Sequence, residues 1–522
     1  MPLGLPYISS AFKKKDYNVF NFNLNSFGNT IKDLAKFISN NNIDVVCSGG
    51  LTAHYFSIKE IFTLAKEINS DIITILGGGI LTSEPELMLK ALNVDFGVVN
   101  EGEETIVDLA HTLENSKNVQ DVRGLVFLDQ NKNFISTTPR NPIKNLSEIN
   151  WPDFEGFGVK EYLDMQTPNC SHYLYPFDKP RILPMISSRS CPFSCTFCYH
   201  PLGKKYRERP LEDFFKELEY LVEAYQINMV ELHDELFSVK KERMTEFCKK
   251  IKQYHIKWFA QFKVNYVDED TLKMVKDAGC YMIGYGLESM NLSVLKSMRK
   301  KTSKAKIERA LSLTRKAMIN IQGNFIFGDP AETEETAQET LDWWKIHREY
   351  QINMWMVIPY PGSQIYLDAI KKGIIKHKLK YIESGCPEVN LTAMSHKTFY
   401  DLQTEVYSSS NHKVHIADPI YSKKMTTDHF NRKLYELKVR CPHCSSVMVY
   451  KNLIIIDDIF FILGCRKCNQ RFNVSCNIFG TEIKKFTKLK IILRRQLGEG
   501  LYYRMSMILP ASLRLSIKNL MK

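Results

Sequence analysis

The folding of this 522-residue chain is constrained most by two runs in which strand patterns alternate with helical patterns. In the first run, apolar segments that end in small or polar residues predict strands at 17–24, 44–49, 71–79 and 95–102. Amphipathic stretches, such as 57–69 and 84–93, separate these segments, and 123–137 reads as a hairpin. This alternation predicts a doubly wound α/β domain.

The second run has a longer period and follows a proline-rich linker. Six of the 20 prolines lie between 139 and 180. Candidate strands follow at 181–189, 227–233, 256–264, 280–287, 320–328 and 352–358. Six β/α units predict a partial (β/α)6 barrel of the TIM type, which would place functional residues at the C-terminal ends of its strands.

Composition and charge narrow the class of protein. Hydrophobic residues make up 44% of the chain and charged residues 25%, which is typical of globular domains. No apolar run is long enough to span a bilayer, and the N-terminal charges follow the apolar part, unlike a secretory signal. We therefore expect a cytoplasmic protein. Residues 482–522 carry ten Lys/Arg against two Glu, or +8 of the net +12, so the rest of the chain gives no argument for nucleic-acid binding.

Cysteines are clustered rather than spread along the chain. Three of the 13 form a C-x3-C-x2-C triad, Cys191, Cys195 and Cys198, and five lie between 441 and 476. Tight clusters in a long chain indicate metal ligation rather than a disulfide framework. Three thiolates suit an iron–sulfur cluster with one open metal position, whereas a structural zinc completed by His200 is the alternative.

The triad, with Phe197 before its third cysteine, resembles the cluster motif of the radical S-adenosylmethionine (radical SAM) enzymes. The resemblance continues through "ELHDELF" (231–237), "GYGLES" (284–289), "GNFIFGDPAET" (323–333) and "IPYPGS" (358–363). It implies that the three cysteines hold a [4Fe–4S] cluster whose fourth iron is chelated by S-adenosylmethionine. One-electron reduction would then yield a 5′-deoxyadenosyl radical that abstracts hydrogen from a substrate.

The same resemblance implies roles for residues at the strand ends. Phe197 would border the adenine, and Glu288 would bind the ribose hydroxyls. Asp234 and Glu235 would face the methionine ammonium, although a helix N-cap explains them too. Lys263 would pair with the methionine carboxylate, and the alternative is a solvated lysine at a strand end. Gly328 and Pro330 would let the backbone approach the nucleoside, and the alternative is a plain turn.

The N-terminal segments "CSGGLTAHY" (47–55), "LGGGILTSEPE" (76–86) and "NEGEET" (100–105) resemble the cobalamin-binding domain fused to many radical SAM enzymes. This class includes the anaerobic magnesium-protoporphyrin ester cyclase and cobalamin-dependent radical methyltransferases. Glycines after strand ends let a nucleotide tail and phosphate approach the backbone. The expected cobalamin contacts are Ser48, Gly49, Thr52, Gly77, Gly78 and Gly79.

One departure from that family concerns the first strand of this domain. The family places a strand before the segment that resembles residues 2–17, whereas here Met1 lies directly on that segment. In a Rossmann-like (flavodoxin-like) sheet of order 2-1-3-4-5 this strand is central. We expect either an upstream start or a sheet that has closed up and lost part of its pocket.

A second metal site is predicted near the C-terminus. Two C-x2-C pairs, Cys441 with Cys444 and Cys465 with Cys468, are separated by 20 residues, the spacing of a zinc ribbon with two strands between its knuckles. Four thiolates close the coordination shell, which predicts a structural zinc ion. An auxiliary iron–sulfur cluster is the alternative, and we expect this module to dock substrate or a partner.

These observations predict a radical SAM enzyme that performs cobalamin-dependent methyl transfer. The alternatives are a cyclase or rearrangement enzyme without cobalamin, or a catalytically silent zinc-ribbon protein that binds a partner or nucleic acid. We expect a small-molecule or lipid- or sugar-linked substrate and a flavodoxin or ferredoxin as electron donor, and no nucleic acid. The basic tail, 484–522, is expected to pack on the barrel or to contact anionic lipid.

The expected domains follow from these motifs. They are a cobalamin-binding-like domain (1–138), a linker (139–180), a radical SAM barrel (181–400), a helical connector (401–440), a zinc ribbon (441–476) and a basic amphipathic tail (477–522).

Overall fold

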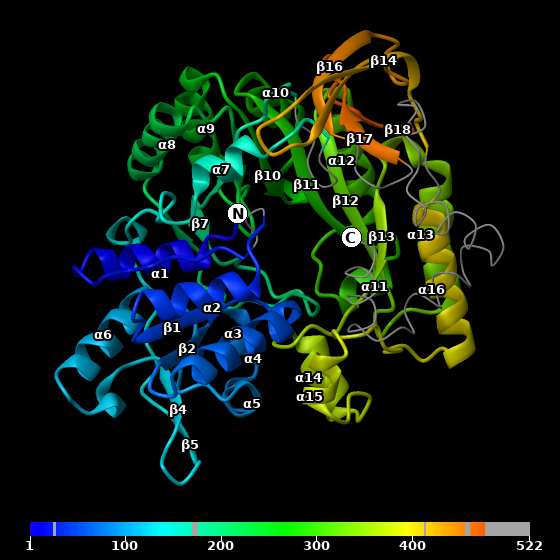
Figure 1. Cartoon of the computed structure of the whole chain (residues 1–522). Coiled ribbons are helices and arrows are strands. Elements are labelled where there is room, and N and C mark those ends of the chain that lie inside the picture. The colour runs from blue at the N-terminus through cyan, green and yellow to red at the C-terminus, as the bar shows by residue number, and fades with distance from the viewer. Residues whose placement is uncertain (25–27, 170–175, 412–413, 455–459, 476–522) are drawn as a thin grey trace. The chain divides into compact units, whose positions relative to one another are not determined.

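The computed structural model describes residues 1–24, 28–169, 176–411, 414–454 and 460–475 (Figure 1). They form two compact units. The first unit consists of 1–162, 186–217 and 358–389, and the second of 163–185, 218–357 and the residues from 390 onward. The chain crosses between the units several times, so neither unit is one continuous segment. The predicted basic tail lies outside the described residues.

The first unit is built on a five-stranded sheet of order β1-β2-β3-β4-β5. Its first three strands are parallel, and β4 and β5 add an antiparallel hairpin. The strands are β1 (Val45–Gly49), β2 (Ile73–Gly77), β3 (Phe96–Val98), β4 (Leu125–Leu128) and β5 (Phe134–Ser136). These positions confirm the predicted strands at 44–49, 71–79 and 95–102 and the hairpin at 123–137.

Helices cover both faces of this sheet. Ile8 and Phe12 of α1 pack with Leu109 of α6 against one face, and Leu34 of α2 and Ala65 of α3 pack near the other. Each helix buries an apolar stripe, which is the pattern that predicted it. The helices of the first unit are α1 (Gly4–Lys13), α2 (Ile31–Asn40), α3 (Tyr55–Ile68), α4 (Gly79–Ser83), α5 (Pro85–Leu92), α6 (Glu103–Glu114), α14 (Gln364–Lys371) and α15 (Lys378–Glu383). Two further helices, α7 (Val159–Asp164) and α8 (Leu211–Tyr225), cross the boundary between the units.

The predicted strand at 17–24 is wrong. This segment contains no strand, although Phe22 and Leu24 pack beside the core of α2 and α3. Its apolar residues are buried as the pattern implied, but in the described part of the chain no neighbouring strand pairs with it, and β1 pairs only with β2. A strand requires a hydrogen-bonded neighbour as well as an apolar face.

The second unit contains six parallel strands in the order β13-β12-β11-β10-β9-β6. They are β6 (Ile182–Met185), β9 (Met229–Leu232), β10 (Lys257–Phe262), β11 (Cys280–Glu288), β12 (Asn320–Phe327) and β13 (Asn353–Met356), which confirms the six predicted positions. These six strands occur in the sheet in the same order as along the chain, from β6 at one edge to β13 at the other. Their C-terminal ends therefore share one edge, where parallel sheets place their ligands.

Helices connect the strands of this sheet in the second unit. They are α9 (Lys241–Ile251), α10 (Glu269–Asp277), α11 (Leu292–Ser297), α12 (Lys304–Lys316), α13 (Glu334–Ile346) and α16 (His396–Asn411). Eight of the nine residues of β11 are buried, as expected for a parallel strand covered on both faces.

The C-terminal part of the second unit is a β module. Its strands are β14 (Asp418–Thr427), β15 (Lys433–Arg440), β16 (Val447–Ile454), β17 (Phe460–Gly464) and β18 (Arg471–Ser475), coloured orange in Figure 1. The connector predicted to be helical over 401–440 is therefore helical only to Asn411. Residues 433–440 alternate between buried and less buried positions, which is a strand pattern rather than a helical one.

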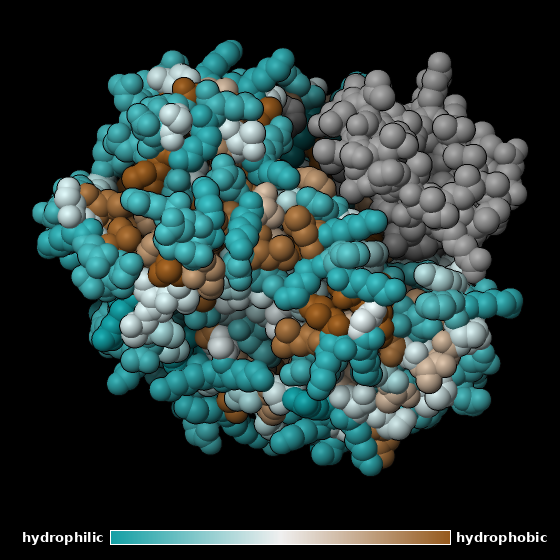
Figure 2. Space-filling model, turned by 90° about the horizontal axis from the view of Figure 1, so that it is seen from below, coloured by the Kyte–Doolittle hydropathy of each residue, from teal (hydrophilic) through white to brown (hydrophobic). Residues whose placement is uncertain are grey.

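The face drawn in Figure 2 is mainly polar. Figure 2 shows one face on which apolar residues form small separate patches. No helix in the described ranges combines the length and apolar content needed to cross a membrane.

Candidate functional site

The three cysteines of the triad lie on a loop of the first unit. Two short strands, β7 (Ser188–Arg189) and β8 (Arg207–Glu208), pair antiparallel at the base of this loop. Cys191, Cys195 and Cys198 are all half-buried, so the three side chains are partly accessible on this loop. Phe197 is half-buried beside them.

Local hydrogen bonds shape the cysteine loop. Ser190 adopts a left-handed conformation with φ of 68°, and its hydroxyl donates to the carbonyl of Leu202 at 3.1 Å. The amide of Cys198 donates to the carbonyl of Cys195 at 3.2 Å. A left-handed serine costs free energy, so the loop conformation is held by its surroundings.

Buried ion pairs fix the base of the loop to the five-stranded sheet. Glu101, which follows β3, accepts from Arg189 at 2.7 Å and from Arg207 at 2.7 Å. Arg189 also pairs with Glu103 at 2.6 Å. Burial by itself lowers the pKa of Arg189, but the carboxylates of Glu103 and Glu101 together outweigh it, so the pKa is raised. All three side chains that meet at Glu101 are at most 7% exposed. These ion pairs thereby fasten the base of the loop to the end of β3.

Tyr199, the residue after the last cysteine, extends this connection. Its hydroxyl donates to the carbonyl of Gly79, after β2, at 3.0 Å. Its ring lies so close to Gly362 that a Cβ there would be 2.3 Å from the ring. The amide of Ile365 donates to the carbonyl of Thr196 at 3.0 Å. The cysteine loop therefore contacts both the glycine loop of the sheet and the "IPYPGS" turn.

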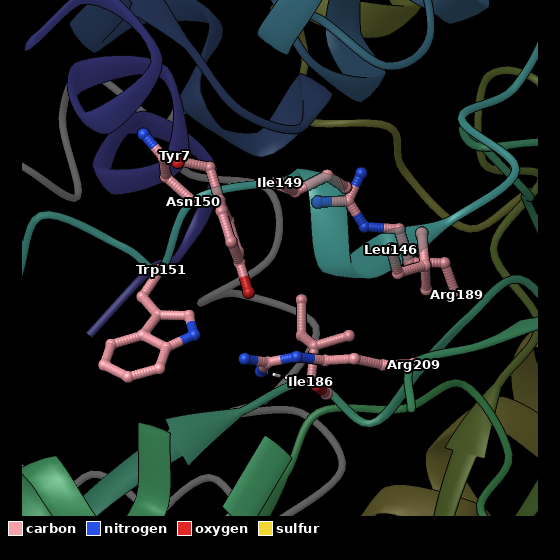
Figure 3. Close-up of a pocket in the computed structure, with 8 residues that line it drawn as sticks. All are labelled: Tyr7, Leu146, Ile149, Asn150, Trp151, Ile186, Arg189 and Arg209. Carbon is pink, nitrogen blue, oxygen red and sulfur yellow. Dashed lines mark hydrogen bonds between the residues drawn. The ribbon is translucent and has the colours of Figure 1, made fainter. Parts of the chain in front are cut away.

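A small pocket lies behind the base of the cysteine loop (Figure 3). Figure 3 shows Tyr7 reaching from α1 towards Ile186 and Arg209. The guanidinium of Arg189 lies 5.2 Å from the centre of the Tyr7 ring, and Arg209 pairs with the buried Glu217. Burial raises the pKa values of Tyr7 and of Glu217. With about 10 Å³ of free volume the pocket has room for one water, so it is a packing feature rather than a substrate site.

The glycines at the strand ends have two different surroundings. A Cβ on Gly49 would lie 2.6 Å from the carbonyl oxygen of Gly77, and one on Gly78 (φ 80°) would lie 2.9 Å from that of Gly50. Gly79 faces Leu51 and Tyr199. These glycines let two loops of the chain touch each other. A Cβ on Gly77, in contrast, would meet nothing within 4 Å.

This arrangement bears on whether the loops can hold cobalamin. The C-terminal end of β2 offers open space at Gly77, and the neighbouring Leu51 is 44% exposed. Ser48 is buried at the end of β1, and Thr52 is buried beside Cys386, whose thiol pKa is raised by burial to about 11. A ligand could therefore approach the backbone at Gly77, while Gly49 and Gly78 serve the contact between the loops.

The predicted ligands of S-adenosylmethionine lie at the C-terminal edge of the six-stranded sheet in the second unit. Asp234 and Glu235 follow β9, and Asp234 is buried whereas Glu235 is exposed. Lys263 follows β10, and its ammonium lies 5.7 Å from the centre of the Tyr266 ring. Pro330 is half-buried after β12.

Glu288 ends β11 in an unusual conformation. Its φ is 67°, and its carboxylate pairs with Lys300 at 2.6 Å. A Cβ on Gly286 would lie within 2.5 Å of both groups, so glycine leaves room for the pair. A buried carboxylate in a strained conformation is typical of a functional site. Lys300 was not predicted from the sequence.

Glu332 is a further residue that the sequence did not single out. One carboxylate oxygen accepts from the amide of Gly328, whereas the other is buried without a partner. Burial raises the pKa of Glu332 to about 8, and it also raises the pKa of Asp329. Gly328 has φ of 96° and packs on Phe399. The sequence signal was the acid four residues after a strand-end glycine, which reads equally as a helix N-terminus.

The four cysteines of the C-terminal module converge. Their four sulfur atoms all lie within 4.8 Å of one another, and the residues are Cys441, Cys444, Cys465 and Cys468. Three of the four are buried. The structure thus brings together the two predicted knuckles. It also places the triad and the glycine loops in one unit, and the strand-end residues in the other.

Comparison with known proteins identifies both parts of the chain. Residues 1–110 match the B12 binding domain, and residues 185–343 match the radical SAM superfamily. An uncharacterized methyltransferase of Pyrococcus horikoshii is 28% identical over 72% of this chain and 79% of its own. The anaerobic magnesium-protoporphyrin IX monomethyl ester cyclase of Rubrivivax gelatinosus is 27% identical over 62% of this chain and 58% of its own, so the match spans little more than half of that protein.

A solved structure shares the fold. The radical S-adenosylmethionine methyltransferase TsrM from Kitasatospora setae superposes with a TM-score of 0.60 at 16% identity, covering 72% of this chain and 74% of TsrM. The two matched domains, their order and the cysteine triad agree with one another. The chain is therefore a radical SAM enzyme with an N-terminal B12-binding domain, related to the magnesium-protoporphyrin ester cyclases and the cobalamin-dependent radical methyltransferases.

Proposed function

We propose that this enzyme transfers a methyl group to a carbon atom of its substrate and depends on cobalamin. The observation that carries the proposal is the connection between the triad and the B12-binding domain. The hydrogen bond of Tyr199 and the ion pairs of Glu101 connect the cysteine loop to the C-terminal ends of β2 and β3 within the first unit. The glycines Gly77, Gly78 and Gly79 at the end of β2, called the glycine edge below, lie in the same unit. Methyl transfer requires this coupling because cobalamin and S-adenosylmethionine must meet.

Individual residues of this chain would divide the work. Cys191, Cys195 and Cys198 would hold a [4Fe–4S] cluster, which supplies the electron for radical chemistry when bound. Three protein ligands leave one iron for the amino and carboxylate groups of S-adenosylmethionine. Phe197 would border its adenine.

The strand-end residues of the second unit would position S-adenosylmethionine. The buried Asp234 and the exposed Glu235 would face its ammonium, and Lys263 its carboxylate. Glu288 would accept from the ribose hydroxyls, with its carboxylate paired to Lys300. Gly328 and Pro330 would border the nucleoside. We further propose that the six-stranded sheet is a partial TIM-type barrel and that the first sheet is a Rossmann-like variant without its usual central strand.

The glycine edge of the first unit would hold cobalamin. Gly77 would allow the nucleotide tail to approach the end of β2, beside Ser48 and Thr52. Gly49, Gly78 and Gly79 would shape this edge by letting the two loops meet.

The partners follow from this chemistry. A flavodoxin or ferredoxin would reduce the cluster, and the substrate would be a small molecule or a lipid- or sugar-linked precursor rather than nucleic acid. The basic tail would offer peripheral contact with a membrane. Since the cysteines are clustered in spacings typical of metal ligation rather than of a disulfide framework, a reducing cytoplasm suits the protein.

Ring formation is the second candidate function. The Rubrivivax gelatinosus cyclase is nearly as similar in identity as the Pyrococcus horikoshii methyltransferase. In methyl transfer, S-adenosylmethionine serves as the methyl donor as well as the radical source, and the donor is released as S-adenosylhomocysteine. A cyclase uses it only as the radical source and releases only 5′-deoxyadenosine and methionine. The products therefore distinguish the two functions.

The test begins with protein purified without oxygen from cells supplied with iron and cobalamin. We expect about four iron and one cobalt per chain, and S-adenosylhomocysteine among the products after reduction with substrate present. Gly77→Leu should lose cobalt and keep iron, because the side chain enters free space and excludes the ligand. Gly4→Leu, whose added side chain also meets nothing within 4 Å, should keep both metals. Full cobalt in Gly77→Leu would refute the proposed edge, and absence of cobalt from the wild type would refute cobalamin dependence.

A further inference from the structure

The C-terminal cysteine tetrad has the dimensions of a site for a single metal ion. The sulfurs of Cys441 and Cys468 are 3.9 Å apart, and those of Cys444 and Cys465 are 3.6 Å apart. Four sulfurs around one tetrahedral zinc, with bonds of about 2.3 Å, lie about 3.8 Å from one another. In a [2Fe–2S] or [4Fe–4S] cluster the four cysteines are divided among two or four irons, which spreads some of their sulfurs further apart than the 4.8 Å within which all four lie here.

The two knuckles also repeat the same backbone turn. In the first, the amide of Ser445 donates to the carbonyl of Cys441 at 3.0 Å, and in the second the amide of Asn469 donates to that of Cys465 at 2.8 Å. Ser445 and Asn469 both adopt left-handed conformations, with φ of 58° and 54°.

Backbone amides also point at the sulfurs. His443 N–H donates to the sulfur of Cys441, and Cys468 N–H to that of Cys465, each at 3.4 Å. Amides directed at sulfur favour the thiolate, which is the form that binds metal. Both matched families end before this module begins.

The second knuckle rests on the beginning of the six-stranded sheet. Gln470 donates to the carbonyl of Ile319 at 3.4 Å, and Asn469 donates to that of Met318 at 3.0 Å, both directly before β12. Gln351, before β13, donates to the carbonyl of Arg471 at 2.7 Å.

Two further contacts reach the other side of the same sheet. Arg466 pairs with Asp178, a few residues before β6, at 2.5 Å. Ile462 of β17 packs against a cluster that includes Ile182, Met229 and Tyr281, at or near the starts of β6, β9 and β11. These residues lie at the N-terminal ends of the strands, opposite the edge that carries Glu288 and Glu332. Figure 1 shows the orange strands at one end of the sheet.

We propose that Cys441, Cys444, Cys465 and Cys468 hold one zinc ion, and that the zinc closes the N-terminal end of the six-stranded sheet. The ion fixes the turn of the second knuckle, and this turn presents Asn469 and Gln470 to the chain before β12. The module is thus a structural closure of the catalytic sheet, and its knuckle face is occupied by the chain itself. The role is independent of cobalamin and of radical chemistry.

The first test measures metal in the full-length protein. We expect about one zinc per chain, with X-ray absorption reporting four sulfur ligands at about 2.3 Å. Cys444→Ser should lose most of the zinc and keep the iron of the triad. Cys248→Ser, which alters a buried cysteine of α9 in the same unit, should keep the zinc. A fifth iron in place of zinc, or a disulfide-linked tetrad without metal, would overturn the assignment.

The second test asks whether the zinc closes the sheet. Hydrogen exchange in Cys444→Ser should rise several-fold at the starts of β11 and β12 and remain unchanged in the first unit. Gln470→Ala should produce a smaller rise at the start of β12 with full zinc occupancy, because it removes the contact and leaves the ion. Unchanged exchange at both strands after loss of zinc would overturn the structural role.

Discussion

The two cysteine sites of this chain differ in how many of the ligands of a metal site the protein itself supplies. The tetrad offers four thiols within 4.8 Å of one another, mostly buried, with amides directed at the sulfurs. The triad offers three half-buried thiols on a loop. A closed shell holds a metal for structure, whereas an incomplete shell leaves a position for a ligand.

The same contrast separates the two ends of the six-stranded sheet. The N-terminal end is covered by the C-terminal cysteine module through hydrogen bonds and one ion pair. The C-terminal end carries a strained Glu288 and a buried carboxylate oxygen of Glu332 without a partner. Stability is concentrated at one end, and the unsatisfied groups that a ligand can complete lie at the other.

The largest expected effect comes from removing one ligand of the open site. Cys195→Ala should abolish assembly of the cluster and reduce cleavage of S-adenosylmethionine by at least about 10³-fold, since no other group supplies the electron. Zinc content should remain that of the wild type. Iron, zinc and 5′-deoxyadenosine measured on the same anaerobic sample check this. Loss of both metals would show that the two sites are not independent.

A large pH effect is expected from Glu332. Burial raises its pKa in the folded state from 4.5 to about 8, so the folded protein binds this proton more tightly than the unfolded chain does. Stability should therefore fall as the pH rises from about 4.5 to 8 and level off above, by at most about 5 kcal/mol at 1.36 kcal/mol per pKa unit. Glu332→Gln removes this titration and should flatten the dependence of Tm on pH.

Glu335→Gln is the matched control for Glu332. Glu335 lies three residues further along in an exposed position, and hydrogen bonding to Thr333 lowers its pKa, so it does not titrate between pH 5 and 8. The control should reproduce the pH profile of the wild type. An unchanged slope in Glu332→Gln would mean that this carboxyl is already ionised in the folded protein.

Most strands and the convergence of the four C-terminal cysteines could be predicted because their signals are local. Apolar runs correctly predicted nine of the ten main strands expected for the two sheets. The strand predicted at 17–24 was wrong, because strand formation also requires a hydrogen-bonded neighbour from elsewhere in the chain. The knuckle and triad spacings each lie within 30 residues. The ion pairs of Arg189 and Arg207 with Glu101 join residues that are 88 and 106 positions apart in the sequence. A local sequence pattern does not predict contacts over such separations.

The next effect concerns the anchor of the open site. Glu101→Gln removes the charge that two buried guanidinium groups share, which typically costs about 3–5 kcal/mol. We expect a fall in Tm of about 10 °C and incomplete iron loading, with zinc unchanged. Glu104→Gln is the control, because Glu104 is exposed and its pair with Arg140 contributes under about 1 kcal/mol. Equal effects of the two changes would refute the buried anchor.

The smallest effect is expected at the contact between the cysteine loop and the glycine edge. Tyr199→Phe removes the hydrogen bond to the carbonyl of Gly79 and leaves the ring against Gly362, which should cost about 1 kcal/mol. Cobalt and iron should remain bound, because ring packing and the Glu101 ion pairs still join the loop to the sheet. Tyr220→Phe, on an exposed face of α8, provides the baseline for Tm. If Tyr199→Phe lost cobalt while Tyr220→Phe retained it, this single hydroxyl would position the glycine edge for cobalamin, and the open site would be as finely fixed as the closed one.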